Sequence, residues 1–225
     1  MRIVSLLPST TEIIFDLGLG DDLLGVTFEC NYPATARVGR EIVVGGMDTK
    51  HLTPVEIDEL VRRRLAAGDE LYRLDDEALS RCDPDLIISQ DLCRVCAVPS
   101  GDVDEAVARL NCRATVLQID PQTLDQVIDS VQTVADAAGV PERGRALVTS
   151  LRARLANLSA STDAARGDRK RPTVFVLEWV DPPFVGGHWV PDVVRAAGAD
   201  PVLSVPGGRS ILPTGRPSRP STPIT

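Results

Sequence analysis

Short runs of aliphatic and β-branched residues alternate along the chain with longer segments of helical periodicity, and this alternation most constrains the fold. It is typical of α/β proteins, in which crossover helices connect parallel strands. The predicted strands cover residues 2–6, 23–27, 85–89, 114–119, 173–179 and 201–205. The predicted helices cover residues 9–17, 54–67, 77–81, 124–138 and 190–197. The sequence therefore predicts an α/β fold.

A long amphipathic segment follows the first strand–helix units. After Pro141 a leucine recurs every three or four residues, the spacing of one helical face, at Leu147, Leu151, Leu155 and Leu158. A helix over 141–160 is roughly 30 Å long at 1.5 Å per residue, enough to cross a small domain. We therefore predict two Rossmann-like lobes joined by one long rigid helix. The predicted parts are an N-terminal ligand-binding lobe (1–139), a bridging helix and linker (140–171), a partial C-terminal lobe (172–205) and a disordered tail (206–225).

The predicted C-terminal lobe is small. Residues 172–205 hold one clear strand, one short helix and a second strand-forming run, which is too little to close a core alone. Residues 206–225 hold five prolines and no acidic residue, so we predict disorder there. Either this lobe leans on the first one or the chain is truncated, and in both cases the second lobe is incomplete.

Charge and hydropathy limit the classes of binding partner that we expect for this chain. The formal net charge of −8 disfavours nucleic acid and anionic membrane surfaces. Residues 1–12 have too short an apolar run for a secretory signal, and no run of about 20 apolar residues predicts membrane insertion. We therefore expect a monomer that is cytoplasmic as the sequence is written, or periplasmic or at the cell surface if the true start lies upstream.

Polar and aromatic residues follow several predicted strands. In parallel α/β sheets, ligands bind at the carboxyl ends of the strands. The residues at these ends, taken as candidate ligand contacts, are Pro8, Ser9, Glu29, Tyr32, Gln90, Asp91, Glu178 and Trp179. Ser9 and Glu12 also have the spacing of a capping box. Ser9 then either caps the helix or lies among backbone N–H groups that hold a phosphate or carboxylate.

Aromatic residues gather in the predicted second lobe. Four of the chain's eight lie within 15 residues: Phe175, Trp179, Phe184 and Trp189. We assign Phe175 to the core and the other three to ligand contact, because a flat ligand gains roughly 0.5–1.5 kcal/mol per stacked aromatic pair beyond area burial. The alternative is that these rings fill the small lobe. A tight turn at residues 186–187 brings His188 toward the cleft expected between the two lobes. There His188 is either a ligand of a metal held in that cleft or an ordinary hydrogen-bonding residue.

The sequence has no complete catalytic or metal-binding pattern. No nucleophile–base pair accompanies the candidate carboxylates Glu29, Asp91 and Glu178, so we expect neither an enzyme nor a resident cofactor or metal. The odd number of cysteines, five, indicates free thiols. Cys93 and Cys96 form a single C-x-x-C pair that Cys30 can approach, but a zinc site needs further ligands. Packed thiols are our interpretation, and a metal- or thiol-dependent protein is the alternative.

Four blocks of residues carry a resemblance to a known family. In chain order they are 2–13 (RIVSLLPSTTEI), 25–33 (GVTFECNYP), 84–93 (PDLIISQDLC) and 177–191 (LEWVDPPFVGGHWVP). Over residues 1 to about 205 the chain resembles the helical-backbone, class III substrate-binding proteins of ABC importers, which bind cobalamin or iron chelates. Within that family it is most similar to the signal-less, cobalamin-binding branch.

The resemblance implies a function. It implies non-catalytic binding of cobalamin or a related corrinoid, a small-molecule ligand, in the cleft between the lobes, with an ABC importer permease as partner. A ferric siderophore or haem is the alternative ligand; it favours basic residues around the cleft, where Arg94 is the only arginine we place. The family continues with further strands and helices where this chain has its Pro-rich tail, so the resemblance also implies C-terminal truncation.

Overall fold

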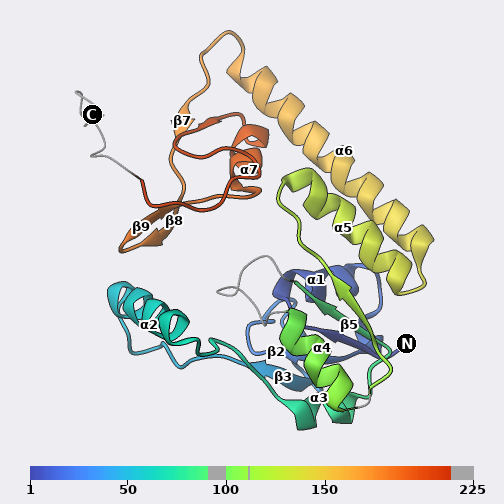
Figure 1. Ribbon diagram of the computed structural model, residues 1–225. Helices are drawn as coiled ribbons and strands as arrows, with labels where there is room; N and C mark the ends of the chain where they lie inside the picture. The colour runs from blue at the N-terminus through green and yellow to red at the C-terminus, as the bar shows by residue number, and fades with distance from the viewer. Residues whose placement is uncertain (91–99, 111, 214–225) are drawn as a thin grey trace.

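A six-stranded sheet forms the centre of the first lobe (Figure 1). The computed structural model of the protein describes residues 1–90, 100–110 and 112–213. Within these residues the strand order is β4-β3-β2-β1-β5-β6, and every neighbouring pair is parallel except β3 and β4. The strands are β1 (Ile3–Ser5), β2 (Leu23–Thr27), β3 (Glu41–Gly45), β4 (Arg73–Leu74), β5 (Leu86–Ser89) and β6 (Thr115–Gln118). The predicted α/β class is confirmed.

Helices cover both faces of this sheet. The first-lobe helices are α1 (Pro8–Asp16), the 3-10 helix η1 (Gly20–Asp22), α2 (Pro54–Ala67), α3 (Asp76–Cys82), α4 (Ser100–Arg109) and α5 (Leu124–Ala137). In β1, Ile3 packs into an apolar cluster with α1 and α5, whereas Val4 packs into a second cluster with α3 and α4. A strand buried on both faces is a nearly continuous apolar run, and this is why β1 and β5 are predictable from sequence.

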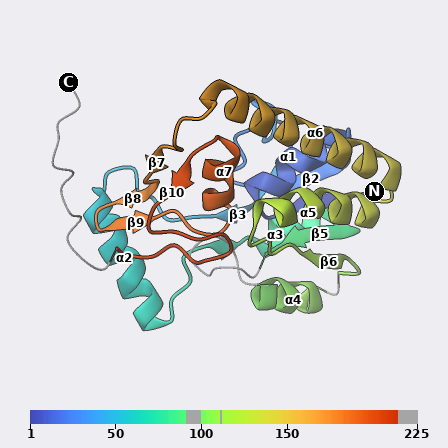
Figure 2. The same ribbon diagram turned by 90° about the horizontal axis from the view of Figure 1, so that it is seen from above.

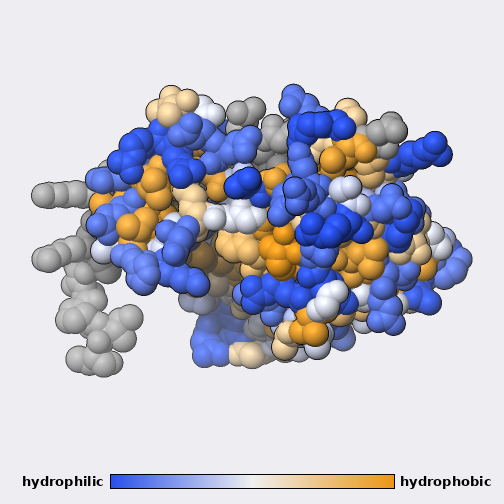
Figure 3. Space-filling view, turned by 90° about the horizontal axis from the view of Figure 1, so that it is seen from below, coloured by the Kyte–Doolittle hydropathy of each residue, from blue (hydrophilic) through white to orange (hydrophobic). Residues whose placement is uncertain are grey.

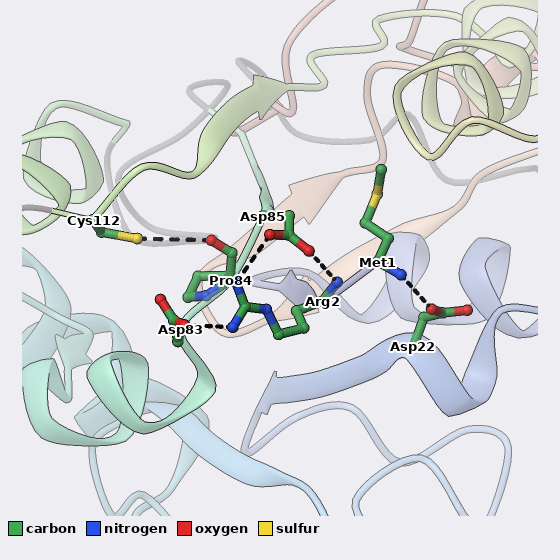
Figure 4. Close-up of polar contacts among 7 residues, drawn as sticks. All are labelled: Met1, Arg2, Asp22, Asp83, Pro84, Asp85 and Cys112. Atoms are coloured by element: carbon green, nitrogen blue, oxygen red, sulfur yellow. Dashed lines mark hydrogen bonds and ion pairs between the residues drawn. The ribbon is translucent and has the colours of Figure 1, made fainter.

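Ion pairs tie together the amino ends of the central strands (Figure 4). The Arg2 guanidinium pairs with Asp83 and Asp85, which precede β5, and the terminal ammonium of Met1 pairs with Asp22 at 2.8 Å. The Arg2 side chain and its backbone N–H hold the pKa of Asp85 below its ordinary value. The Arg2–Asp85 pair therefore contributes its full stabilisation above the ordinary carboxyl pKa. That stabilisation is lost as the pH falls through the lowered pKa of Asp85.

One long helix connects the lobes. Helix α6 (Pro141–Arg166) has 26 residues and packs beside α5 (Figure 1). It extends past the predicted end at 160, and the predicted linker over 161–171 is therefore too long. The extension is polar, and an ion pair between Asp163 and Arg166, 2.8 Å apart on one face of the helix, stabilises it. Polar composition alone does not distinguish an exposed helical turn from a loop.

Gly144 allows the close approach of α6 to α5. A Cβ at this position would lie 2.5 Å from the Cβ of Ala135, closer than two carbons can pack. We expect Gly144→Ala to lower the free energy of unfolding by about 1–2 kcal/mol, because overpacking outweighs the gain in helix propensity. Urea unfolding followed by circular dichroism measures this. Ser150→Ala, at an exposed position of the same helix, is the control and should be near neutral; an unchanged or raised stability for Gly144→Ala would contradict the packing argument.

The second lobe is much smaller than the first. Its elements are β7 (Thr173–Val174), β8 (Leu177–Val180), β9 (Pro183–Val185), α7 (Val190–Ala196) and β10 (Asp200–Pro201). β7 pairs with β10, and β8 pairs with β9 as an antiparallel hairpin. The single strand predicted over 173–179 is thus divided in two, and that over 201–205 is reduced to β10. Two lobes joined by a long helix, the second with two two-stranded sheets among the described residues, agree with the predicted architecture.

Residues 206–213 differ from the disordered tail that the sequence predicts. Ile211 forms a β-bridge with Val185, and the Gly208 carbonyl accepts from the His188 N–H. Composition misses this order because the bonding partners lie 20 and 26 residues earlier, in the turn after β9 and in β9 itself. The remainder of the predicted tail, 214–225, lies outside the described residues.

Helix α2 stands apart from the sheet. It begins with the predicted capping box, in which the Thr53 hydroxyl and the Glu56 carboxylate each accept from the other residue's N–H, and Gly68 ends it at a φ of +77°. None of its residues is buried, and it lies below the β8–β9 hairpin in Figures 1 and 2. Figure 3 shows a hollow between this helix and the rest of the first lobe, with hydrophobic and charged residues mixed around it.

Candidate ligand-binding site

The strand order reverses next to β1. The chain passes from β1 to β2 and β3 on one side and returns to β5 and β6 on the other, so the order reverses between β1 and β5. Ligands of open α/β sheets bind outside the carboxyl ends of the strands at such a reversal. Pro8 and Ser9 follow β1, and Gln90 follows β5, so these three candidates lie at the carboxyl ends of the two strands that flank the reversal. Figures 1 and 2 place the second lobe on this side of the sheet.

The turn from β1 into α1 is held by buried hydroxyl groups. Ser5 Oγ lies 2.7 Å from Thr10 Oγ1 and accepts from Thr11 Oγ1 at 2.9 Å, all three residues being buried. Helix α1 starts at Pro8 with Leu7 as N-cap and no side-chain cap, so the predicted capping box of Ser9 and Glu12 is wrong. Pro8 at the first helical position is favourable, and the N-cap is Leu7 in place of the predicted Ser9. Ser9 is thus exposed in the first turn, and Pro8 is half-buried.

The segment after β2 presents Glu29 and Tyr32 beside a buried thiol. Tyr32 is 65% exposed. Burial raises the pKa of the Glu29 carboxyl. Cys30, which lies between them, is fully buried, with Sγ 3.1 Å from Thr11 Oγ1 and 3.3 Å from Thr27 Oγ1. These contacts connect the loop after β2 to α1, so Cys30 anchors the loop that carries the two candidates.

The loop after β5 is described only in part. Gln90 is half-buried at its start. Asp91, a candidate ligand contact, and Arg94, the arginine placed near the cleft, lie outside the described residues, as do Cys93 and Cys96. Within the described ranges, no three His, Cys, Asp or Glu side chains group as a metal site.

The aromatic residues of the second lobe form two pairs. Trp179 and Phe184 are cross-strand partners in the β8–β9 hairpin, and Trp179 Nε1 donates to the Asp181 carbonyl at 3.1 Å. The His188 and Trp189 rings lie 5.7 Å apart at 36°. All four are half-buried. Phe175, which the sequence assigns to the core, is 43% exposed, because it lies at the surface of the small lobe between the short strands β7 and β8.

Glu178 is engaged within its own lobe. Its two carboxylate oxygens accept from Ser210 Oγ at 2.8 and 2.7 Å, and one also accepts from the Gly187 N–H at 3.3 Å. A Cβ at Gly187 would lie 2.3 Å from the Ser210 nitrogen, so only glycine allows this approach. We infer that Glu178 supports the turn before His188; its role as a ligand contact stays a prediction. Ser210 is the partner that sequence reasoning missed, since it falls in the predicted tail.

This arrangement predicts a local effect of Glu178→Ala. The Gly187 N–H is shared between Glu178 at 3.3 Å and Ser210 Oγ at 3.2 Å, and Ser210 Oγ is itself held by Glu178. Amide exchange at Gly187 should therefore become up to about tenfold faster, because a hydrogen bond to a charged group is worth roughly 1.5 kcal/mol and tenfold corresponds to about 1.4 kcal/mol. Hydrogen exchange read by NMR measures this rate. Glu59→Ala, an exposed glutamate of α2, is the matched control and should leave Gly187 unchanged. Equal exchange rates in both variants would show that Glu178 does not hold the turn.

A family model and curated proteins match most of the chain. The model, described as "Periplasmic binding protein", matches residues 3–214. An uncharacterized ABC transporter substrate-binding lipoprotein, YvrC of Bacillus subtilis, is 25% identical over 182 residues, which cover 80% of this chain and 48% of that protein. The vitamin B12-binding protein of Vibrio cholerae is 24% identical over 201 residues, 88% of this chain and 59% of that protein. The chain therefore spans about half the length of these relatives.

Solved structures show the same fold. The periplasmic vitamin B12-binding protein BtuF of Vibrio cholerae superposes with a TM-score of 0.64 at 22% identity, covering 95% of this chain and 70% of that one. The periplasmic haem-binding protein RhuT of Roseiflexus gives a TM-score of 0.58 at 27% identity, covering 89% and 65%. At 22% identity, the likeness to BtuF is evidence of a shared fold alone.

Proposed function

Because this chain belongs to the periplasmic binding protein family, we propose that it is a non-catalytic ligand-binding protein that holds cobalamin or a related corrinoid between its lobes. The observation that carries the proposal is that the exposed Tyr32 follows the carboxyl end of β2, and that the second lobe, in which Trp189 is the N-cap of α7, lies on that side of the sheet. A corrin ring is flat and largely apolar, so aromatic side chains from two sides stabilise it. A relative that binds vitamin B12 supports this ligand class.

Polar groups complete the proposed site. Corrinoids carry amide side chains around the ring, and these donate to carboxylates and exchange hydrogen bonds with amides. Glu29 and Gln90 present such groups near the strand ends, and Ser9 presents a hydroxyl in the first turn of α1. Hydrogen bonds to the edge of the ring, together with aromatic contacts to its two faces, fix the orientation of a bulky ligand.

Haem or another iron chelate is the second candidate ligand. The likeness to the haem-binding protein of Roseiflexus favours it. So does the exposed phenol of Tyr32, which is a ligand for ferric iron, and the His188 imidazole is a second donor. We rank it behind a corrinoid because, in the described segment after β2, the Glu29 carboxylate is exposed, whereas the Arg37 guanidinium is engaged by the Phe28 carbonyl at 2.9 Å and Arg40 by the Leu23 and Gly20 carbonyls.

A thiol-dependent activity has less support. The Cys30 thiol is buried and bonded to two threonines. Burial raises the pKa of the Cys82 thiol to about 11, so it stays protonated at neutral pH and is a poor nucleophile. The proposal therefore assigns the protein no reaction.

An ABC importer permease is the proposed partner. Matching proteins are named as an ABC transporter lipoprotein and as periplasmic, so the comparisons give the expected cytoplasmic location no support. No helix in the described part of the chain combines the length and apolar character of a membrane span. We propose that the protein acts as a monomer that delivers its ligand to the permease.

Calorimetric titration separates the ligand classes. The purified full chain is titrated with cyanocobalamin, with haemin and with a ferric siderophore at the same concentrations. We expect saturable one-to-one binding with cyanocobalamin and weaker or no binding with the other two. Tighter binding of haemin would favour the second candidate, and no heat with any of the three would defeat the proposal.

A further inference from the structure

A carboxylate of the second lobe binds the start of a first-lobe helix. Asp192 Oδ2 accepts from the backbone N–H of Leu124 at 3.1 Å, and the bond is partly buried. Asp192 lies in the first turn of α7, and Leu124 is the first residue of α5. The two residues are 68 positions apart, so this bond joins separate parts of the chain.

The bond completes the first turn of α5. The first N–H groups of a helix have no partner within it. In α5 the Gln126 N–H donates to Thr123 Oγ1 at 3.3 Å, and the Gln126 side chain in turn accepts from the Thr123 N–H. The Leu124 N–H has no acceptor within this capping box and donates to Asp192. A carboxylate at a helix N-terminus is also favoured by the helix dipole.

Helix α7 is also packed at its far end, so the orientation of the second lobe depends on the bond from Asp192 to α5 at the other end. At the far end of α7, a Cβ at Gly198 would lie 2.9 Å from the Cβ of Thr162 in α6, so that end is closely packed against the long helix. Near Asp192, a Cβ at Gly207 would lie 3.7 Å from the Thr123 methyl group. α7 is thus packed on α6 at one end and bonded to α5 at the other.

We propose that Asp192 is a positioning residue that fixes the orientation of the second lobe over the first and thereby places Trp189 against the ligand. Trp189 is the N-cap of α7, three residues before Asp192. A rotation of α7 about its packed end would move the Trp189 end farthest. The link to ligand binding rests on the proposed function, whereas the orientation itself does not.

Residual dipolar couplings test the orientation without a ligand. At 24.2 kDa the protein is suited to NMR, and in the wild type the couplings of both lobes should fit one alignment tensor. In Asp192→Ala the two lobes should require separate tensors, whereas Asp192→Asn keeps an acceptor oxygen and should behave as wild type. Asp168→Ala removes the same charge from an exposed position after α6 and is the matched control.

A second variant removes the donor. Leu124→Pro deletes the N–H at the first helical position, where proline is favoured, and the extended backbone of Thr123 accommodates a following proline. It should separate the tensors as Asp192→Ala does, and the double variant should add nothing. A single shared tensor in both Asp192→Ala and Leu124→Pro would overturn the proposal.

The dissociation rate of cyanocobalamin gives the functional readout. We expect it to rise about tenfold in Asp192→Ala and to stay within about twofold of wild type in Asp192→Asn and Asp168→Ala. An unchanged rate alongside separated tensors would overturn the link between Asp192 and the ligand. If wild-type protein does not bind cyanocobalamin, the proposed function fails, while the dipolar couplings still decide the role of Asp192 in orientation.

Discussion

Replacing Tyr32 with alanine should weaken cyanocobalamin binding by about 10- to 30-fold and leave the melting temperature unchanged. The ring is 65% exposed, so its removal costs the fold little. In the complex it would lose a stacking contact and its area burial, together about 1.4–2 kcal/mol, and each 1.4 kcal/mol is tenfold in affinity. Calorimetry gives the dissociation constant, and differential scanning fluorimetry gives the melting temperature.

Two further variants sharpen this experiment. Tyr32→Phe keeps the ring and should bind cyanocobalamin within about twofold of wild type, whereas haem ligation through the phenol would be lost. Val38→Ala, at an exposed position in the same connection between β2 and β3, should leave the affinity unchanged. A Tyr32→Ala protein that binds as tightly as wild type would remove this residue from the site.

Replacing Ile87 with alanine should lower the free energy of unfolding by about 2–5 kcal/mol. Ile87 is fully buried in the middle of β5 and packs in the cluster that contains Val4, Leu79 and Val103. Truncation removes apolar burial and leaves a cavity that the surrounding helices fill only in part. For a chain of this size the melting temperature should fall by roughly 10 °C.

Ile42→Ala is the matched control for that change. Ile42 lies in β3 of the same sheet but is 39% exposed, so the same truncation should cost less than about 1 kcal/mol. Chemical unfolding of both variants by urea gives the comparison. Similar losses for the two variants would contradict the assignment of β5 to the centre of the core.

The sequence predicts elements whose signal is local. The buried runs of β1 and β5, the capping box of α2 at Thr53 and the leucine spacing of α6 each depend on residues within a few positions of one another. The same holds for the candidates after the strands, because strand direction alone assigns Ser9 and Gln90 to one edge of the sheet.

What the sequence misses depends on distant partners. Strand β3 has only a short apolar core, at Val43 and Val44, and is defined by pairing with β2. Ser210 falls in a Pro-rich segment and is ordered by Glu178, 32 residues earlier. Asp192 has the appearance of an ordinary first-turn acid of α7, and its bond to Leu124 follows only from the way the lobes are arranged.

The central claim is that one ligand contacts both lobes at once. Chemical-shift mapping of isotope-labelled protein during a cyanocobalamin titration tests it most directly. We expect the resonances of Ser9, Tyr32 and Gln90 in the first lobe and of Trp179 and Trp189 in the second to shift together, with one common dissociation constant. Shifts confined to one lobe, or two different constants for the two groups, would contradict it.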